Sequence, residues 1–231
     1  MSAVVRIVLV LCAIVTGVEP AHSVQGAPLR GVVLWSGAVE AKKLAVTIDQ
    51  YVCGKEKIAD DLVVGAQRGL RNAVVWLQTP PAGVSAEAAP AKVEMDQKAC
   101  AFVPRVVLVP AGGTVEFLNS DRLLHNVHSV SRENPSFNRT QPRGRVIPVT
   151  FAKPEIVRIN CDLHSWMRGW VVVADHPFYA LSNEAGEFEL PPVPAGKYTL
   201  QIWHETLGIS SRDVTVGPEG ARITVDLKAK P

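Results

Sequence analysis

The chain has 231 residues, of which 47% are hydrophobic and 20% charged, and its formal net charge is +2. This balance is typical of a globular protein and excludes a chain that is disordered for lack of apolar residues. The 24 basic residues form no long run and are not interleaved with aromatic residues, so we expect no nucleic-acid partner.

The sequence begins with the features of a secretory signal peptide. Arg6 precedes an apolar run from Ile7 to Val15, and Ala21 and Ser23 place small residues at the positions that a signal peptidase reads. A membrane anchor is the alternative, but it needs about 20 apolar residues and the run is too short. We therefore expect residues 1–23 to be removed, the mature chain to be periplasmic or secreted, and no membrane span to remain.

Beyond this segment the hydrophobic pattern alternates with period two, which is typical of half-buried strands. The clearest stretches are 114–117, 156–161, 198–202 and 222–227, and glycine- or proline-containing turns separate them. Helical periodicity is almost absent, apart from one short helix that we expect within 58–69. The pattern predicts an all-β fold built of sandwiches.

Two composition breaks divide the chain. Residues 79–91 are rich in Pro, Ala, Gly and Ser and read as a loop or linker, and Pro177 ends a strand pattern. Three segments result, 27–79, 92–175 and 176–231.

The third segment resembles the carboxypeptidase-regulatory-like (transthyretin-like) β-sandwich. The resemblance rests on Asn183–Phe188 as a turn and strand, followed by Pro194–Leu200 as a corner and strand. Such sandwiches usually begin with strands like 31–35 and 72–77, which lie in the first segment here. We therefore interpret 27–79 and 176–228 as two parts of one small sandwich domain with 92–175 inserted. Three consecutive units, or one sandwich with long hairpins, are the alternatives.

Removal of the signal would take Cys12 and leave three cysteines. An oxidising compartment favours pairing, so we expect a disulfide between Cys53, in a loop after a strand at 44–48, and Cys100. Cys161 is then left over. Pairing of Cys161 with one of the other two is the alternative.

The leftover thiol lies among further metal-ligating side chains. Cys161, His164 and Met167 are spaced three residues apart after a predicted strand, and His125 follows the strand at 114–119. Thiolate and thioether favour reduced copper, and imidazole suits both of its oxidation states. Surface histidines, an inert thiol and a core methionine are the structural alternative.

This segment resembles the cupredoxin (type 1 blue-copper) family, closest to the amicyanin and plastocyanin group. The resemblance rests on the Cys-x-x-His-x-x-Met loop and on His125-Asn-Val-His after a Gly-x-Thr-Val strand that ends in Asn119. It implies a Greek-key sandwich over 92–175 with one type 1 copper, held by His125, Cys161, His164 and axial Met167. It also implies that Asn126 ties the two ligand loops together by hydrogen bonds.

The same resemblance implies a carrier of single electrons, with transfer through an exposed edge of His164 and with Trp166 in an apolar rim where the partner docks. We expect that partner to be an exported redox protein, such as a c-type cytochrome or a periplasmic dehydrogenase. An oxidase or reductase would need a further copper centre, and we expect no enzyme activity because the sequence offers no second three-histidine set. A copper carrier or sensor, a structural module, and zinc in place of copper are the alternatives.

The remaining histidines of the mature chain are interpreted as structural or exposed. They are His128, which would point away from His125 on a strand, His176 beside a proline, and His204 on a half-buried face. A second metal site at His204 is the alternative.

Overall fold

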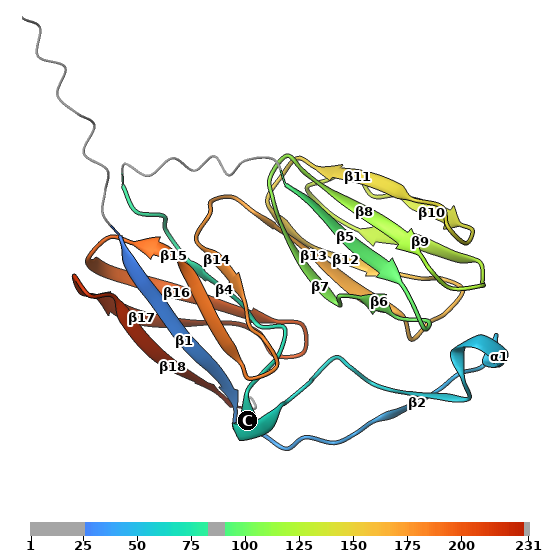
Figure 1. Cartoon of the computed structure of the whole chain (residues 1–231), viewed down its shortest axis with the longest axis horizontal. Helices are drawn as coiled ribbons and strands as arrows, with labels where there is room; N and C mark the ends of the chain where they lie inside the picture. Colours follow the sequence, from blue (N-terminus) through green and yellow to red (C-terminus); the bar gives the residue numbers. More distant parts are fainter. Residues whose placement is uncertain (1–25, 83–90, 229–231) are drawn as a thin grey trace, which may run out of the picture.

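The computed structural model describes residues 26–82 and 91–228, so the predicted signal peptide lies outside the described residues. Strands make up nearly all of its regular structure, and they form two sandwich-like β units, which confirms the predicted all-β class (Figure 1). None of the helices in the described ranges is both long and apolar enough to cross a membrane.

The inserted unit spans residues 92–174 and has two sheets that share one core. Their strand orders are β10-β9-β12-β13-β7 and β11-β8-β5-β6. The strands are β5 (Lys92–Gln97), β6 (Phe102–Val103), β7 (Val106–Pro110), β8 (Gly113–Asn119), β9 (His125–Val130), β10 (Asn138–Gln141), β11 (Ile147–Phe151), β12 (Glu155–Asn160) and β13 (Arg168–Ala174). The chain passes repeatedly from one sheet to the other, as expected of a Greek key. Alternating apolar residues such as Val115 and Phe117 fill the core between the sheets.

The second unit is built from both ends of the chain. Its strand orders are β15-β1-β18 and β14-β4-β16-β17. The strands are β1 (Ala27–Trp35), β4 (Val74–Leu77), β14 (Tyr179–Leu181), β15 (Glu187–Val193), β16 (Gly196–His204), β17 (Gly208–Val216) and β18 (Ala221–Leu227). β1 lies between β15 and β18, and β4 lies between β14 and β16, so strands from before and after the inserted unit share both sheets.

The two units meet along an apolar contact with a buried ion pair at its edge. Val74 and Trp203 of the second unit cluster with Val106 and Val172 of the inserted unit. Beside them, Arg105 Nη2 donates to Glu205 Oε2 at 2.8 Å, and Trp170 Nε1 donates to the same oxygen at 2.9 Å. Glu205 of the second unit therefore accepts hydrogen bonds from two residues of the inserted unit across this contact.

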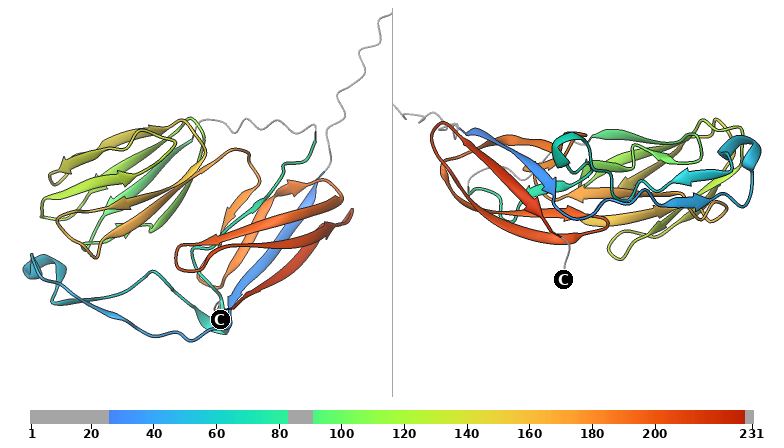
Figure 2. Two further views of the ribbon diagram at one scale, coloured as in Figure 1. Left: turned by 180° about the vertical axis from the view of Figure 1, so that it is seen from behind. Right: turned by 90° about the horizontal axis from the view of Figure 1, so that it is seen from below.

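A long excursion, residues 36–68, leaves the second unit after β1 and returns to it before β4. We call it the arm. Its elements are β2 (Lys43–Ala45), α1 (Gln50–Cys53), β3 (Glu56–Ile58) and a 3-10 turn, η1 (Ala66–Arg68). Figures 1 and 2 show the arm running from the second unit along the inserted unit, with α1 at its far end.

The arm corrects two expectations. The strand expected at 44–48 ends at Ala45, and Cys53 closes the short helix α1 instead of lying in a loop. The helix expected within 58–69 is a single 3-10 turn. Leu62 and Val64 pack against the core of the second unit, so tertiary contacts hold this stretch in an irregular conformation and not in a helix.

Candidate metal centre

The sheet register brings the two predicted ligand segments to one end of the inserted unit. β9 and β12 are antiparallel neighbours in which His128 lies opposite Asn160. His125, at the start of β9, therefore lies beside the loop that follows β12. That loop runs from Cys161 to Met167 and connects directly to β13.

Three of the four predicted ligands converge at this end. The Nδ1 atoms of His125 and His164 are 2.9 Å apart, and Cys161 Sγ lies 3.8 Å from the first and 3.5 Å from the second. Both histidines are 0% exposed and Cys161 is 2% exposed. The three donor atoms thus face one another in a site closed to water.

Met167, the fourth predicted ligand, closes the same loop. Its backbone N–H donates to the His164 carbonyl oxygen at 2.8 Å, and its own carbonyl oxygen accepts from the Cys161 N–H at 3.4 Å. The side chain is buried in the core cluster that contains Cys161. The thioether is therefore held within the ligand loop and shielded from water.

A carboxylate holds the outer nitrogen of each imidazole. His125 Nε2 lies 3.0 Å from Asp121 Oδ2, and His164 Nε2 lies 3.1 Å from Asp49 Oδ2. Because a carboxylate accepts hydrogen bonds, each Nε2 carries the proton and each Nδ1 presents a lone pair. Two lone pairs at 2.9 Å repel each other unless a cation or a proton lies between them. This donor set fits a metal ion.

Burial disfavours the charged forms of Cys161 and His125. Burial raises the pKa of the Cys161 thiol, against the opposing effect of the backbone N–H groups of Asn126, His164 and Leu163. Burial also lowers the pKa of His125, against the opposing hydrogen bond to Asp121. A bound metal would displace the thiol proton, because the thiolate is the ligand.

Asn126 joins the two ligand segments. Its Oδ1 accepts from the backbone N–H of Asp162 at 2.7 Å, and its Nδ2 donates to Asn138 Oδ1 at 2.6 Å. These bonds tie the start of β9 to the residue after Cys161 and to β10. His128 lies apart from the centre, half-exposed, with its Nδ1 2.8 Å from Asp162 Oδ1.

The expectation of an exposed His164 edge is wrong. Asp49, at the start of α1, covers the outer nitrogen, and the ring of Trp166 lies 5.2 Å from the imidazole between centroids. The covering segment comes from outside the residues that carry the family resemblance. Trp166 is partly buried and donates from Nε1 to the Cys100 carbonyl oxygen at 3.2 Å, so it packs beside the disulfide. The prediction placed Trp166 in an apolar rim around an exposed His164. Because His164 is buried, the structure does not support that role.

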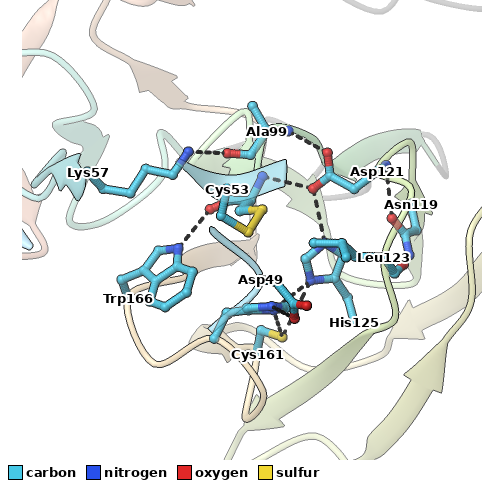
Figure 3. The surroundings of a disulfide bond; sticks show 12 residues. Asp49, Cys53, Lys57, Ala99, Asn119, Asp121, Leu123, His125, Cys161 and Trp166 are labelled. Atoms are coloured by element: carbon cyan, nitrogen blue, oxygen red, sulfur yellow. Dashed lines mark hydrogen bonds and ion pairs between the residues drawn. A yellow bond between two sulfur atoms is a disulfide. The ribbon is translucent and has the colours of Figure 1, made fainter. Parts of the chain in front are cut away.

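The predicted disulfide between Cys53 and Cys100 is confirmed, and Cys161 is a free, buried cysteine. The bond joins α1 of the arm to a turn of the inserted unit (Figure 3). The backbone N–H groups of Ala99 and Cys100 in that turn donate to the Asp121 carboxylate at 2.7 and 2.8 Å. Asp121 therefore fixes both the disulfide turn and the imidazole of His125.

Sequence reasoning missed the two carboxylates. Asp121 could have been proposed from the sequence, since it lies only four residues before His125. Asp49 is 115 residues away from His164. The sequence offers one indication that Asp49 lies near His164. The expected disulfide brings residues near Cys53, Asp49 among them, to the inserted unit.

Neither a protein-family model nor a curated protein sequence matches the chain. The solved structures similar to part of it include cupredoxins and a copper enzyme. A Cu-containing nitrite reductase from Thermus scotoductus SA-01 is 26% identical over 41% of this chain and 25% of its own, with a TM-score of 0.34. A purple cupredoxin from Nitrosopumilus maritimus is 22% identical over 36% and 99%, with a TM-score of 0.32. Amicyanin from Paracoccus versutus is 22% identical over 43% and 96%, with a TM-score of 0.32.

Proposed function

We propose that this chain is an exported copper protein that carries single electrons between redox partners. His125, Cys161 and His164 would hold the copper ion, with Met167 as the axial ligand. The observation that carries the proposal is the convergence of two imidazole lone pairs and a thiol in a buried site.

The donor chemistry supports copper in both oxidation states. A thiolate and a thioether suit Cu(I), while two imidazoles suit Cu(II) as well, so one set of ligands serves both. A copper ion bound there would gain and lose one electron. The residues supply a rigid frame, because the ligand loop is closed by its own backbone hydrogen bonds and anchored at both ends in strands.

Export and partner belong to the same proposal. The disulfide supports an oxidising compartment, in agreement with the signal peptide expected at residues 1–23. The partner would be another exported redox protein, such as a c-type cytochrome or a periplasmic dehydrogenase, which supplies or accepts the electron.

A copper carrier is the rival function, and the covered site favours electron transfer over it. A carrier must release its ion, which requires the arm to move away from His164. An electron leaves without any displacement of the ligands or of the arm.

The test is a visible spectrum of the purified metal-free protein after addition of Cu(II), with Cys161→Ser in parallel and His176→Asn as a control histidine variant. We expect an intense thiolate band that ascorbate bleaches, that is absent from Cys161→Ser and that persists in His176→Asn. A protein that binds no copper, or binds zinc in strong preference to copper, would contradict the proposal. Copper bound without a thiolate band would favour the carrier.

A further inference from the structure

We propose that Asp49 is a positioning residue of the metal centre and that the arm is a permanent cap over it. The carboxylate of Asp49 would orient His164 toward the metal, and the disulfide would keep the arm seated so that outside ligands do not reach the ion. This inference rests on the proposed copper site and gives the second β unit a role, because both ends of the arm are rooted there.

The local conformation of Asp49 indicates that its side chain serves the centre and not the helix. Asp is a preferred residue at a helix N-cap because its side chain accepts from the first N–H groups of the helix. Asp49 occupies the N-cap of α1 but makes no such side-chain bond. Its carboxylate contacts His164 Nε2 instead.

The backbone of Asp49 is also strained. Its φ is 55° and its ψ 32°, in the left-handed region that non-glycine residues seldom adopt. Such conformations persist where the surroundings hold them, and they concentrate at functional sites. The carbonyl oxygen still accepts from the N–H groups of Val52 and Cys53, so α1 forms while the carboxylate turns to the imidazole.

The interactions around the centre close into a ring. His164 contacts Asp49, and α1 links Asp49 to Cys53 and its disulfide with Cys100. The Cys100 N–H donates to Asp121, which contacts His125. The ring closes where the two Nδ1 atoms face each other. One disulfide thus joins the supports of both imidazoles, and Figure 3 shows the two supporting residues, Asp49 and Asp121, near Cys53.

Further contacts keep the arm in place beyond the disulfide. Lys57 Nζ donates to the Ala99 carbonyl oxygen, and Asp60 pairs with Arg105 of the inserted unit. Before α1, Val46 is buried in the core cluster of the inserted unit, so the arm is anchored on both sides of α1 and at both of its roots. A loop held at so many points covers His164 continuously instead of opening freely.

The chemical consequence follows from the charge of the carboxylate. An imidazole whose N–H donates to a carboxylate is a stronger metal ligand, and loss of such a partner typically weakens metal binding about 10- to 100-fold. Added electron density on His164 stabilises Cu(II) more than Cu(I). Removal of Asp49 would therefore raise the reduction potential as well as open the site.

The experiment compares wild type with Asp49→Asn, Asp49→Ala and Glu56→Gln. Asparagine tolerates the left-handed conformation and keeps a neutral acceptor, so it preserves the fold while removing the charge. Glu56 is an exposed carboxylate of the same arm, paired with Lys43, and Glu56→Gln serves as the matched control. A Cys53→Ala/Cys100→Ala double variant removes the tether.

The first readout needs no copper. In nitrogen-15 spectra of the metal-free protein we expect a slowly exchanging His164 Nε2–H proton in wild type and in Glu56→Gln, and its loss in Asp49→Ala. A proton that exchanges at the same rate in Asp49→Ala would overturn the inference. This readout decides on the cap even if wild type turns out to bind no copper, which would defeat only the proposed function.

The second readout is the rate at which a chelator removes Cu(I) from the loaded protein, together with the reduction potential. We expect removal to be at least about 10-fold faster in Asp49→Ala, intermediate in Asp49→Asn and unchanged in Glu56→Gln. The potential should rise in the same order. Equal removal rates and potentials in wild type, Asp49→Asn, Asp49→Ala and Glu56→Gln would overturn the inference. We expect the Cys53→Ala/Cys100→Ala variant to lose copper faster than wild type, and an unchanged rate there would overturn the role of the disulfide.

Discussion

The two β units bury their histidines in opposite ways. In the second unit, His176 Nε2 donates to the Leu77 carbonyl oxygen at 2.9 Å and its Nδ1 accepts from the Phe178 N–H at 3.2 Å. In the inserted unit, His125 and His164 each spend one nitrogen on a carboxylate and point the other at a second lone pair. The backbone thus satisfies both nitrogens of His176, while His125 and His164, the proposed ligands, each keep one nitrogen without a backbone partner.

His204 belongs with His176 in this comparison. It is buried, its Nδ1 accepts from the Thr206 N–H at 3.3 Å, and burial lowers its pKa against the opposing charge of Glu205. Among the residues that the structure describes, the groups of donors close enough to hold a metal all include His125, and neither His176 nor His204 belongs to one.

The sharpest test replaces one histidine of each kind and compares the two variants. His125→Asn should weaken copper binding by more than the roughly 100-fold that loss of a supporting partner causes, because it removes a proposed ligand itself. His176→Asn should keep copper binding and lose about 1–3 kcal/mol of stability, because it disturbs two buried hydrogen bonds. Copper titration and urea unfolding of both variants measure the two effects. A copper defect in His176→Asn would break the comparison.

The next largest effect, on stability, is expected at the contact between the two units. Arg105→Met leaves Glu205 buried without its partner, and we expect a loss of about 3–5 kcal/mol in the free energy of unfolding. The side chains of Arg105 and Glu205 are 9% and 4% exposed. In the matched control, Arg30→Met, the broken pair with Glu189 is 54% and 55% exposed, and its loss should lower the free energy of unfolding far less. Similar losses in the two variants would show that the contact contributes no more than a surface pair.

The next prediction compares an aspartate that contacts a proposed ligand, Asp121, with an aspartate on the surface of the second unit. Asp121→Asn should weaken copper binding about 10- to 100-fold, because the amide no longer provides the charge that His125 Nε2–H faces. Asp213 of the second unit accepts from the Thr199 hydroxyl on the surface, and Asp213→Asn should leave copper binding unchanged. Isothermal titration with copper compares them, and equal affinities for the two variants would refute the role of Asp121.

The smallest expected effect is on the pH dependence of stability, at a residue away from the candidate metal centre. Burial alone would raise the pKa of Glu155, but hydrogen bonds from Ser131, Arg132 and Asn134 lower it to about 2. Since the unfolded value is about 4.3, this stabilisation is complete above that pH and is lost as the pH falls through about 2. Glu155→Gln should therefore be less stable than wild type at pH 6 and equal to it near pH 2, by thermal unfolding. A difference that persists unchanged at pH 2 would contradict this.

The sequence allowed prediction of the features that depend on nearby residues. Alternation along 114–119 and 156–161 predicted β8 and β12, and the cysteine count pointed to the disulfide that the structure contains. The buried state of His164 was beyond such reasoning, because it depends on a contact with Asp49 across 115 positions. The path of the arm likewise follows from packing of Leu62 and Val64 on a distant core and not from local propensity.

The place of β1 in its sheet governs the order in which the molecule can assemble. Its two neighbours, β15 and β18, lie beyond residue 186, and those of β4 begin at residue 179. The last predicted ligand, Met167, emerges from the ribosome or translocation channel before any of these strands. The inserted unit, and the disulfide that joins it to the arm, can therefore form while both roots of the arm still lack strand partners. The final strands of the chain then fix those roots in the second unit.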